Sequence, residues 1–348
     1  MRADVQGLMG GELGSWLDQQ SGMRETAKKT AHDRWFYGAL VLLPLSLFWW
    51  LMDDFSTLKF YLVGFAAIGI GIWGYQPIAE AKKEIKVGIN SAIAHNLGIA
   101  YEHDVEPGSE FDAARNYGLV PGYDRSSFED NWYGELEGHG FSLYESHLEE
   151  RRGSGKNRRW VTVFRGAIIN MQFGREFRST TLLQRAGKHK KWFGLGGRKD
   201  KVNFGGHQLD LVDQVHPDFE DVFDVYSDDR IESRVLVHPS YIEHLLALES
   251  AFKGDAVRAL FLRGEVIIAV ESGDLFESGS LDSSGDAERA EEAAEQFAAL
   301  ARLALALNQN DRGRTVGQTG PDDARDLGSE SVLAPKRAAG GGFGRKGL

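Results

Sequence analysis

Two long runs of apolar residues near the start of the chain constrain its fold more than any other feature. Residues 35–52 contain no charged side chain, and neither do residues 60–75. Crossing a bilayer core takes about 20 mainly apolar residues. The first run is long enough, and the second becomes so when it is extended to 58–78 with Lys59 reaching toward the membrane surface. We therefore expect a hairpin of two transmembrane helices over 35–78, at 35–52 and 58–78, joined by a loop at 53–57.

Aromatic residues stand at both ends of each run, where a membrane helix meets the headgroups. They are Trp35, Phe36, Tyr37, Trp49, Trp50, Phe60, Tyr61, Trp73 and Tyr75. The alternative is a pair of buried helices in a soluble core, but a core does not require aromatic residues at the helix ends. The aromatic pattern therefore favours membrane helices.

Basic residues flank the hairpin and predict its orientation. They lie just before the first span and just after the second, at Arg24, Lys28, Lys29, Arg34, Lys82, Lys83 and Lys86. The connecting loop carries Asp53 and Asp54, with Lys59 as its nearest basic neighbour. Because basic loops stay in the cytoplasm, we expect both termini to be cytoplasmic and the loop to face outward.

The overall composition limits the chemistry available to the rest of the chain. The 348 residues include no cysteine, which excludes disulfides, thiolate metal sites and cysteine nucleophiles. The net charge of −11 argues against nucleic acid as a partner. A mean hydropathy of −0.34 with 26% charged residues is typical of a soluble protein outside the two apolar runs.

Small residues recur on one side of the second span, at Gly64, Ala67, Gly71 and Gly74. Such a strip lets another helix approach closely. We expect it to pack against the first span, and packing against a second copy of the chain is the alternative.

The chain after the hairpin divides by its hydrophobic pattern. An N-terminal segment at 1–34 precedes the spans, and a connector at 79–128 follows them. The connector begins with a helix after Pro77 that places Ile85, Ile89, Ile93 and Leu97 on one face. The tail at 309–348 is rich in Gly, Asp and Arg, which predicts disorder.

Residues 129–308 alternate short strands with few helices. We predict strands at 132–137, 141–149, 160–173 with a break near Gly166, 177–185, 207–213, 257–263 and 265–271, and helices at 239–250 and 285–308. Strands with few interposed helices indicate an α+β fold. We expect a cytoplasmic antiparallel sheet, like a partial barrel, with flanking helices.

One segment resembles a known family. Phe223, Val225, Tyr226, Ser227 and Asp229, then Glu232, Ser233 and Arg234, then Pro239, follow the order of a bacterial family of two-span inner-membrane proteins, the domain of unknown function numbered 3137. Val163, Phe164 and Gly166 match a strand of the same family. The resemblance extends over about residues 30–275 and implies a bacterial inner-membrane location. It implies no activity, because none is established for the family.

The same segment raises the question of catalysis. Ser227, His238 and nearby carboxylates suggest a hydrolase, but the Gly-x-Ser-x-Gly turn that presents a nucleophilic serine is missing. His238 and His244 are six residues apart, which places them on different faces of a helix. The glycine-rich stretch at 194–199 lacks the Lys-Ser/Thr of a phosphate loop. We therefore predict no catalytic, cofactor or metal residues, and keep a hydrolase near Ser227 and His238 as an alternative.

Two basic loops indicate a binding surface instead. Anionic lipids attract nearby Lys and Arg with about 1 kcal/mol each, and aromatic side chains can enter the membrane interface. The candidate lipid contacts are Lys188, Lys190, Lys191, Trp192, Phe193, Arg198, Lys199, Arg151, Arg152, Arg158 and Arg159. Two ordinary solvated loops would give the same pattern.

These observations favour a membrane-anchored protein that binds a protein partner or anionic lipid headgroups and is not an enzyme. An accessory subunit of an envelope or secretion complex is a further alternative. The sequence names neither the partner nor the oligomeric state, although a homo-oligomer is compatible with the glycine strip.

Overall fold

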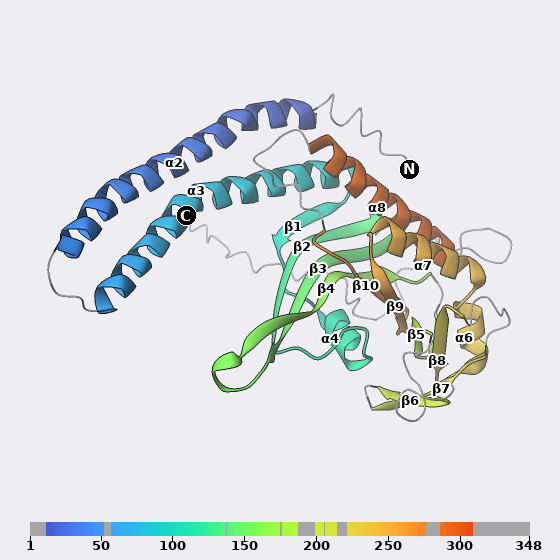
Figure 1. Ribbon diagram of the computed structural model, residues 1–348. Helices are drawn as coiled ribbons and strands as arrows, with labels where there is room; N and C mark the ends of the chain where they lie inside the picture. Colours follow the sequence, from blue (N-terminus) through green and yellow to red (C-terminus); the bar gives the residue numbers. More distant parts are fainter. Residues whose placement is uncertain are drawn as a thin grey trace, which may run out of the picture. The chain divides into compact units, whose positions relative to one another are not determined.

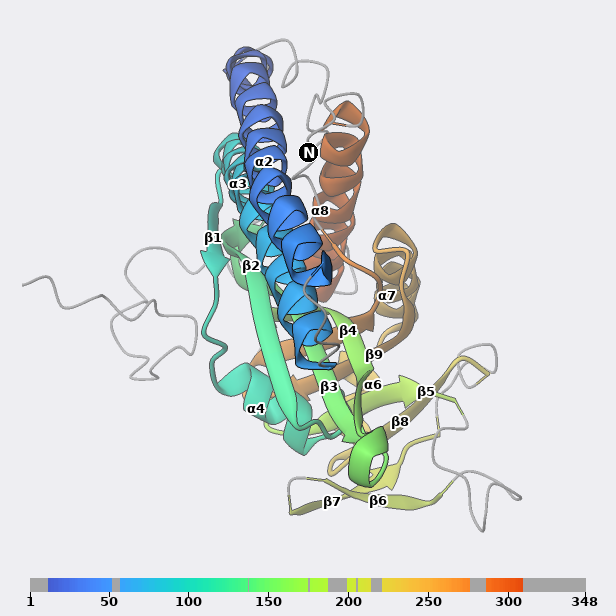
Figure 2. The same ribbon diagram turned by 60° about the vertical axis from the view of Figure 1, so that its left-hand side comes forward.

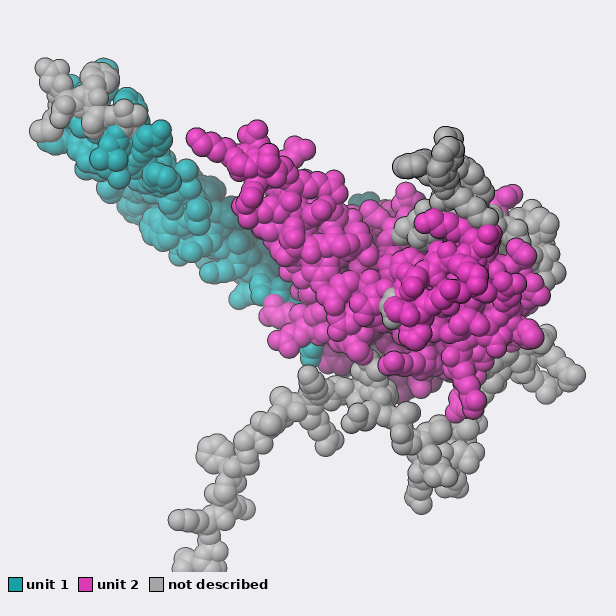
Figure 3. Space-filling view, turned by 90° about the horizontal axis from the view of Figure 1, so that it is seen from below, with its two compact units in different colours: residues 1–103, 274–298 teal, residues 104–273, 299–348 magenta. Residues whose placement is uncertain are grey.

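The computed structural model describes residues 12–51, 57–136, 138–174, 176–186, 199–204, 206–213, 221–275 and 286–308. The chain forms two compact units. The first comprises residues 1–103 and 274–298, and the second comprises residues 104–273 and 299–348. Figure 3 colours the first unit teal and the second magenta.

The first unit contains two long helices that lie side by side, α2 (Glu12–Leu51) and α3 (Thr57–Leu97) (Figure 1). Both are long and apolar enough to cross a membrane. α3 runs through Pro77 without interruption, so the expected start of a new helix at this proline was wrong. A proline removes one backbone donor but does not have to end a helix whose other hydrogen bonds and packing persist.

Burial changes abruptly along these two helices. Ala31 of α2 and Ile85, Ile89 and Ile93 of α3 are almost completely buried. Between these positions the helices expose their apolar side chains: of the 23 exposed large hydrophobic residues among the described part of the chain, 20 lie between Trp35 and Tyr75. The predicted spans therefore coincide with a band of the two helices that the protein itself does not cover.

Small residues and one indole join α2 to α3. A side chain at Gly74 would collide with the Trp35 ring, and one at Gly38 would collide with Ile70. The Trp35 indole also donates a hydrogen bond to the carbonyl of Gly71 at 3.3 Å. At Gly64, by contrast, an added Cβ would meet nothing within 4 Å.

The strands form one open sheet in the order β1-β2-β3-β4-β10-β9-β5-β8-β7-β6. Every pairing whose register is known, from β2 to β6 along this order, is antiparallel. The strands are β1 (Ala100–Asp104), β2 (Arg125–Leu136), β3 (His139–Arg152), β4 (Arg159–Gln172), β5 (Thr181–Arg185), β6 (Lys201–Phe204), β7 (His207–Leu211), β8 (Phe223–Ser227), β9 (Asp255–Leu262) and β10 (Glu265–Glu271).

The helices around these strands are α4 (Ser109–Asn116), the short η1 (Gly155–Asn157), α6 (Arg230–Leu236), α7 (Pro239–Ala251) and α8 (Asp286–Asn308). α8 crosses the boundary between the units at residues 298–299. In Figure 2, β2 and β3 run at a steep angle to β5, which shows the twist of the sheet. Twisting of this kind is the normal consequence of strand chirality.

Hydrophobic side chains are buried on both faces of this sheet, since β8 and most of β10 are buried at consecutive positions. Tyr144, Phe164, Ile168 and Tyr226, which come from strands on both sides of its centre, pack with Phe111 of α4. Tyr241 of α7 contacts Phe261 of β9 with ring centroids 5.3 Å apart. The side chains that each strand buries therefore help to fix its position in the sheet.

The antiparallel sheet and its flanking helices confirm the predicted α+β class. The sheet is open, with β1 and β6 at its edges, and its expected likeness to a partial barrel stays a prediction. The strand predicted to break near Gly166 is continuous as β4, although its pairing with β3 shifts at Val163. Sequence patterns missed β1, β6 and α4, which are short elements with weak periodicity. The loop predicted at 53–57 and the tail at 309–348 lie, apart from Thr57, outside the described residues.

Candidate functional site

The segment that resembles the family begins with a buried strand. All five residues of β8 are buried, and Ser227 is fully so. The Ser227 hydroxyl lies 2.9 Å from the Thr181 hydroxyl and donates to the carbonyl of Asp229 at 3.0 Å. It also accepts a hydrogen bond from the Asp229 N–H at 3.1 Å. A buried hydroxyl with these partners stabilises the turn after β8 and is not available as a nucleophile.

Asp229 starts the following helix. Its carboxylate accepts hydrogen bonds from the N–H groups of Ile231 at 2.8 Å and Glu232 at 3.0 Å, which makes it the N-cap of α6. The cap of this helix is therefore Asp229 and not the neighbouring Ser227. The backbone N–H groups of Glu232 and Ile231 lower the pKa of the Asp229 carboxyl, because they favour its charged form.

Two further carboxylates tie this segment to the chain before β5. Asp228 accepts a hydrogen bond from the N–H of Thr180 at 2.8 Å. Glu232 accepts from the N–H groups of Arg178 at 3.1 Å and Ser179 at 2.6 Å. These acidic residues therefore satisfy backbone donors that no strand partner reaches.

His238 has a comparable local role. Its ring accepts a hydrogen bond from the N–H of Ser240 at 3.3 Å and lies 2.9 Å from the Ser240 hydroxyl, so that it caps α7. Pro239 occupies the first turn of this helix, where a missing N–H costs nothing. The described contacts of His238 and Ser227 do not include each other.

The second family motif also has a structural explanation. Gly166 has φ of +149°, and a Cβ at this position would collide with the carbonyl oxygen of Val270 in β10. Phe164 is buried in the main core. The glycine is required because β4 and β10 approach each other closely at this point.

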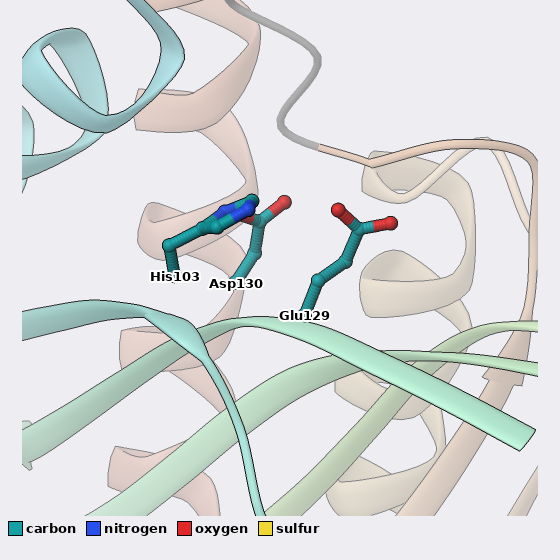
Figure 4. Close-up of side chains that lie close together, drawn as sticks. All are labelled: His103, Glu129 and Asp130. Carbon is teal, nitrogen blue, oxygen red and sulfur yellow. The ribbon is translucent and has the colours of Figure 1, made fainter. Parts of the chain in front are cut away.

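A β-bulge in β2 brings two acidic side chains together. The pairing with β3 shifts between Glu129 and Trp132, and Asp130 has φ of +59°. Figure 4 shows the side chains of Glu129 and Asp130 on the same side of β2, as a bulge allows. His103, the third labelled side chain, belongs to the first unit. Two adjacent carboxylates do not define a cation site, and we assign none to them.

The end of the β3–β4 hairpin is an exposed polar feature of the second unit. We call residues 149–162 the arm; Figure 1 shows it projecting from the sheet with η1 at its tip. Every residue from 151 to 160 is exposed. The five basic side chains of this stretch are Arg151, Arg152, Lys156, Arg158 and Arg159.

Trp160 lies among the cations of the arm. Its side chain is 42% exposed, with the guanidinium of Arg125 4.3 Å and that of Arg151 5.9 Å from its ring centroid. Arg125 also donates a hydrogen bond to Glu149, and this contact lowers the pKa of the Glu149 carboxyl. These contacts order the base of the arm without covering it.

An open depression of about 670 Å³ lies beside the arm. Its walls mix acidic, basic and apolar groups, and Arg152 pairs with Glu150 there at 2.8 Å. The lining residues are Pro121, Gly122, Tyr123, Asp124, Glu150, Arg152, Thr162 and Val163. The depression widens the polar surface of the arm but has no charge preference of its own.

The structure separates the residues predicted to contact lipid into two groups. Arg151, Arg152, Arg158 and Arg159 lie on the arm, and Lys199 is exposed next to β6. The others, Lys188, Lys190, Lys191, Trp192, Phe193 and Arg198, lie outside the described residues. Trp160 was not among the predicted contacts, although an aromatic residue directly after a basic loop was a usable signal.

Comparisons with known proteins give little functional information. The crystal structure of the mycobacterial trehalose monomycolate transport factor A, TtfA, aligns with 62% of this chain and 91% of that chain, at 11% sequence identity and a TM-score of 0.32. This similarity is too low to support a common fold. A comparison with curated proteins finds no match.

A protein family does match the sequence. Residues 162–309 match a family described as "Protein of unknown function (DUF3137)". The match includes the β8–α6–α7 segment and Gly166, whose structural roles are described above, and the earlier part of the resemblance stays a prediction. This confirms the resemblance for the matched part of the chain: residues 162–309 are similar to the DUF3137 family, whose function is unknown.

Proposed function

We propose that this protein is a membrane-anchored binding protein rather than an enzyme. In this proposal, α2 and α3 hold it in the bacterial inner membrane, and the arm binds an anionic partner. The observation that carries the proposal is a contrast: the serine, histidine and acidic residues suggestive of catalysis form internal hydrogen bonds, whereas the arm presents its cations to solvent.

The anchor is supported by the band of exposed apolar side chains between Trp35 and Tyr75. A soluble monomer rarely exposes so large a contiguous apolar surface. Lipid hydrocarbon is the environment in which such a surface costs least, and the aromatic residues at both ends suit the headgroup region.

Site-specific labelling tests the predicted orientation. Because the chain has no cysteine, Ser56→Cys provides a single thiol in the loop between the spans. We expect a membrane-impermeant maleimide to label this variant from outside once the outer barrier is opened, and the Ser154→Cys variant to react only after the inner membrane is broken. Labelling of the Ser56→Cys variant only from the cytoplasmic side would overturn the proposed topology.

The arm is suited to an anionic ligand by its charge. Five basic residues lie within nine positions, and Lys156, Arg158 and Arg159 form no described ion pair with a carboxylate. Anionic headgroups of the membrane that holds the anchor are one source of negative charge, and the half-exposed Trp160 favours them as a candidate. An acidic protein segment is the other source.

A fluorophore on Ser154→Cys reports on the arm in the full chain. We expect its signal to change with anionic lipid in nanodiscs, or with added polyglutamate in nanodiscs of zwitterionic lipid, and salt to weaken the response. Replacing Lys156, Arg158 and Arg159 with Gln should abolish the response. The matched control replaces three exposed basic residues elsewhere in the second unit with Gln, namely Arg178, Lys253 and Arg263. This control variant should still give the fluorescence response. A response to neither ligand would overturn the proposal.

A further inference from the structure

One edge of the arm is an unpaired strand. β4 pairs with β3 from Arg159 to Met171, but with β10 only from Gly166 to Gln172. The last bond on that side joins the Ser272 N–H to the carbonyl of Arg165 at 2.8 Å. Among the described strands, β3 and β10 are the neighbours of β4, so Arg159 to Thr162 and Phe164 have a strand partner on one side only, and Val163 lies at a register shift between them.

Hydrogen bonds of β3 reveal which backbone groups face this edge. The Glu149 carbonyl accepts from the Asp124 N–H at 2.9 Å, and the Arg151 N–H donates to the Asp124 carboxylate at 2.7 Å. Both groups therefore point away from β4. Opposite residues in an antiparallel ladder either exchange both bonds or neither. Thr162 and Trp160, which lie opposite Glu149 and Arg151, consequently turn their own N–H and C=O groups toward the free edge.

The basic side chains near this edge favour an acidic strand as its binding partner. The arm that contains this edge has five basic side chains, whereas its two carboxylates are engaged, Glu149 with Arg125 and Glu150 with Arg152. An incoming strand with acidic side chains would pair its backbone with β4 and its carboxylates with the arm. A second copy of the arm would instead bring two basic surfaces together, which disfavours self-pairing.

We propose that the free edge of β4 binds an extended acidic segment of a partner protein, which adds as a further strand beside Trp160 and Thr162. Strand addition of this kind takes its affinity from backbone hydrogen bonds and its selectivity from side chains. This inference rests on the proposed function, since it names the class of anionic partner that the arm receives. Lipid headgroups have no backbone to pair and would use the cations alone.

The first test compares two peptides on the full chain in zwitterionic nanodiscs. One is a short peptide in which glutamate alternates with threonine, and the other has the same sequence with every backbone nitrogen methylated. Both carry the same charge, but only the first can donate backbone hydrogen bonds. We expect the first to bind and the methylated peptide to bind about tenfold more weakly or worse.

The second test removes one donor from the protein. Thr162→Pro deletes an N–H that faces the free edge and takes no part in the β3–β4 ladder. It also removes the threonine hydroxyl that lies 2.9 Å from His147. Thr162→Val is the matched control, because it loses the same hydroxyl but keeps the N–H. We expect Thr162→Pro to weaken peptide binding about tenfold and Thr162→Val to leave it unchanged.

Amide hydrogen exchange supplies a readout that does not depend on a variant. Bound peptide should slow exchange at the N–H groups of Trp160 and Thr162, and change that of Val161 little, because the latter faces β3. Equal binding of the two peptides, or unchanged exchange at Trp160 and Thr162 in the bound state, overturns strand addition. If binding is then still lost with Lys156, Arg158 and Arg159 replaced, the anion-binding function stands while the inference fails.

Discussion

The segment from Ser227 to Arg234 and the arm are both rich in polar side chains, yet they use them in opposite ways. In the first, Ser227, Asp228, Asp229 and Glu232 each bind backbone groups of the same unit. In the arm, the basic side chains reach into solvent. The difference shows that a concentration of chemical groups indicates function only when those groups are not already engaged in holding the fold together.

The largest effect is expected where the arm joins the sheet. Gly166→Ala would place a Cβ against the Val270 carbonyl at a φ that L-residues rarely adopt. We expect a loss of about 3 kcal/mol or more in the free energy of unfolding. Chemical denaturation of the full chain in detergent, followed by near-ultraviolet circular dichroism, measures it. A change near zero would mean that β4 and β10 can separate at this point.

A smaller loss of stability is expected from single substitutions that compare the two polar regions directly. Glu232→Ala removes the acceptor of the Arg178 and Ser179 N–H groups, and we expect a loss of about 1–3 kcal/mol. Glu150→Ala in the arm breaks only an exposed pair with Arg152, and we expect less than about 0.5 kcal/mol. The same denaturation experiment compares them. Equal losses would contradict the division into an internal and an outward-facing region.

The smallest effect is a difference in pH dependence. Burial raises the pKa of Glu265, despite the hydrogen bond from Asn170. Stability should therefore fall as pH rises from the unfolded pKa of this carboxyl through its folded pKa, and Glu265→Gln should remove that fall. Asp229 has a lowered pKa, so its contribution is present above its unfolded pKa and is lost as pH falls through the folded one.

Melting curves between about pH 3 and 8 compare Glu265→Gln with Asp229→Asn. The melting temperature of Glu265→Gln should rise relative to that of the natural chain toward neutral pH. Asp229→Asn should melt below the natural chain at neutral pH, and this difference should disappear in acid. Parallel curves for both variants would show that neither carboxyl titrates differently in the folded state.

The sequence predicted the strongly periodic elements well. The apolar runs, the amphipathic face of Ile85 and Ile89, and the strand patterns of β9 and β10 each follow from local spacing, which a single segment carries. It missed β1 and β6, whose few residues become strands only through their neighbours in the sheet. Local sequence also does not show that Asp229 caps α6, because several adjacent side-chain oxygens could reach the same N–H groups.

By itself, the sequence determined that two uncharged apolar runs precede an antiparallel α+β region, because hydrophobic period and length are local properties. Only the tertiary structure decided which polar residues are engaged in hydrogen bonds within the fold. Ser227 meets Thr181, and Glu232 meets Ser179, across more than 40 residues of chain. The free edge of β4 likewise depends on where β10 stops pairing. A hydrogen bond is satisfied or left open by partners brought together in space, and no local pattern records which partners those will be.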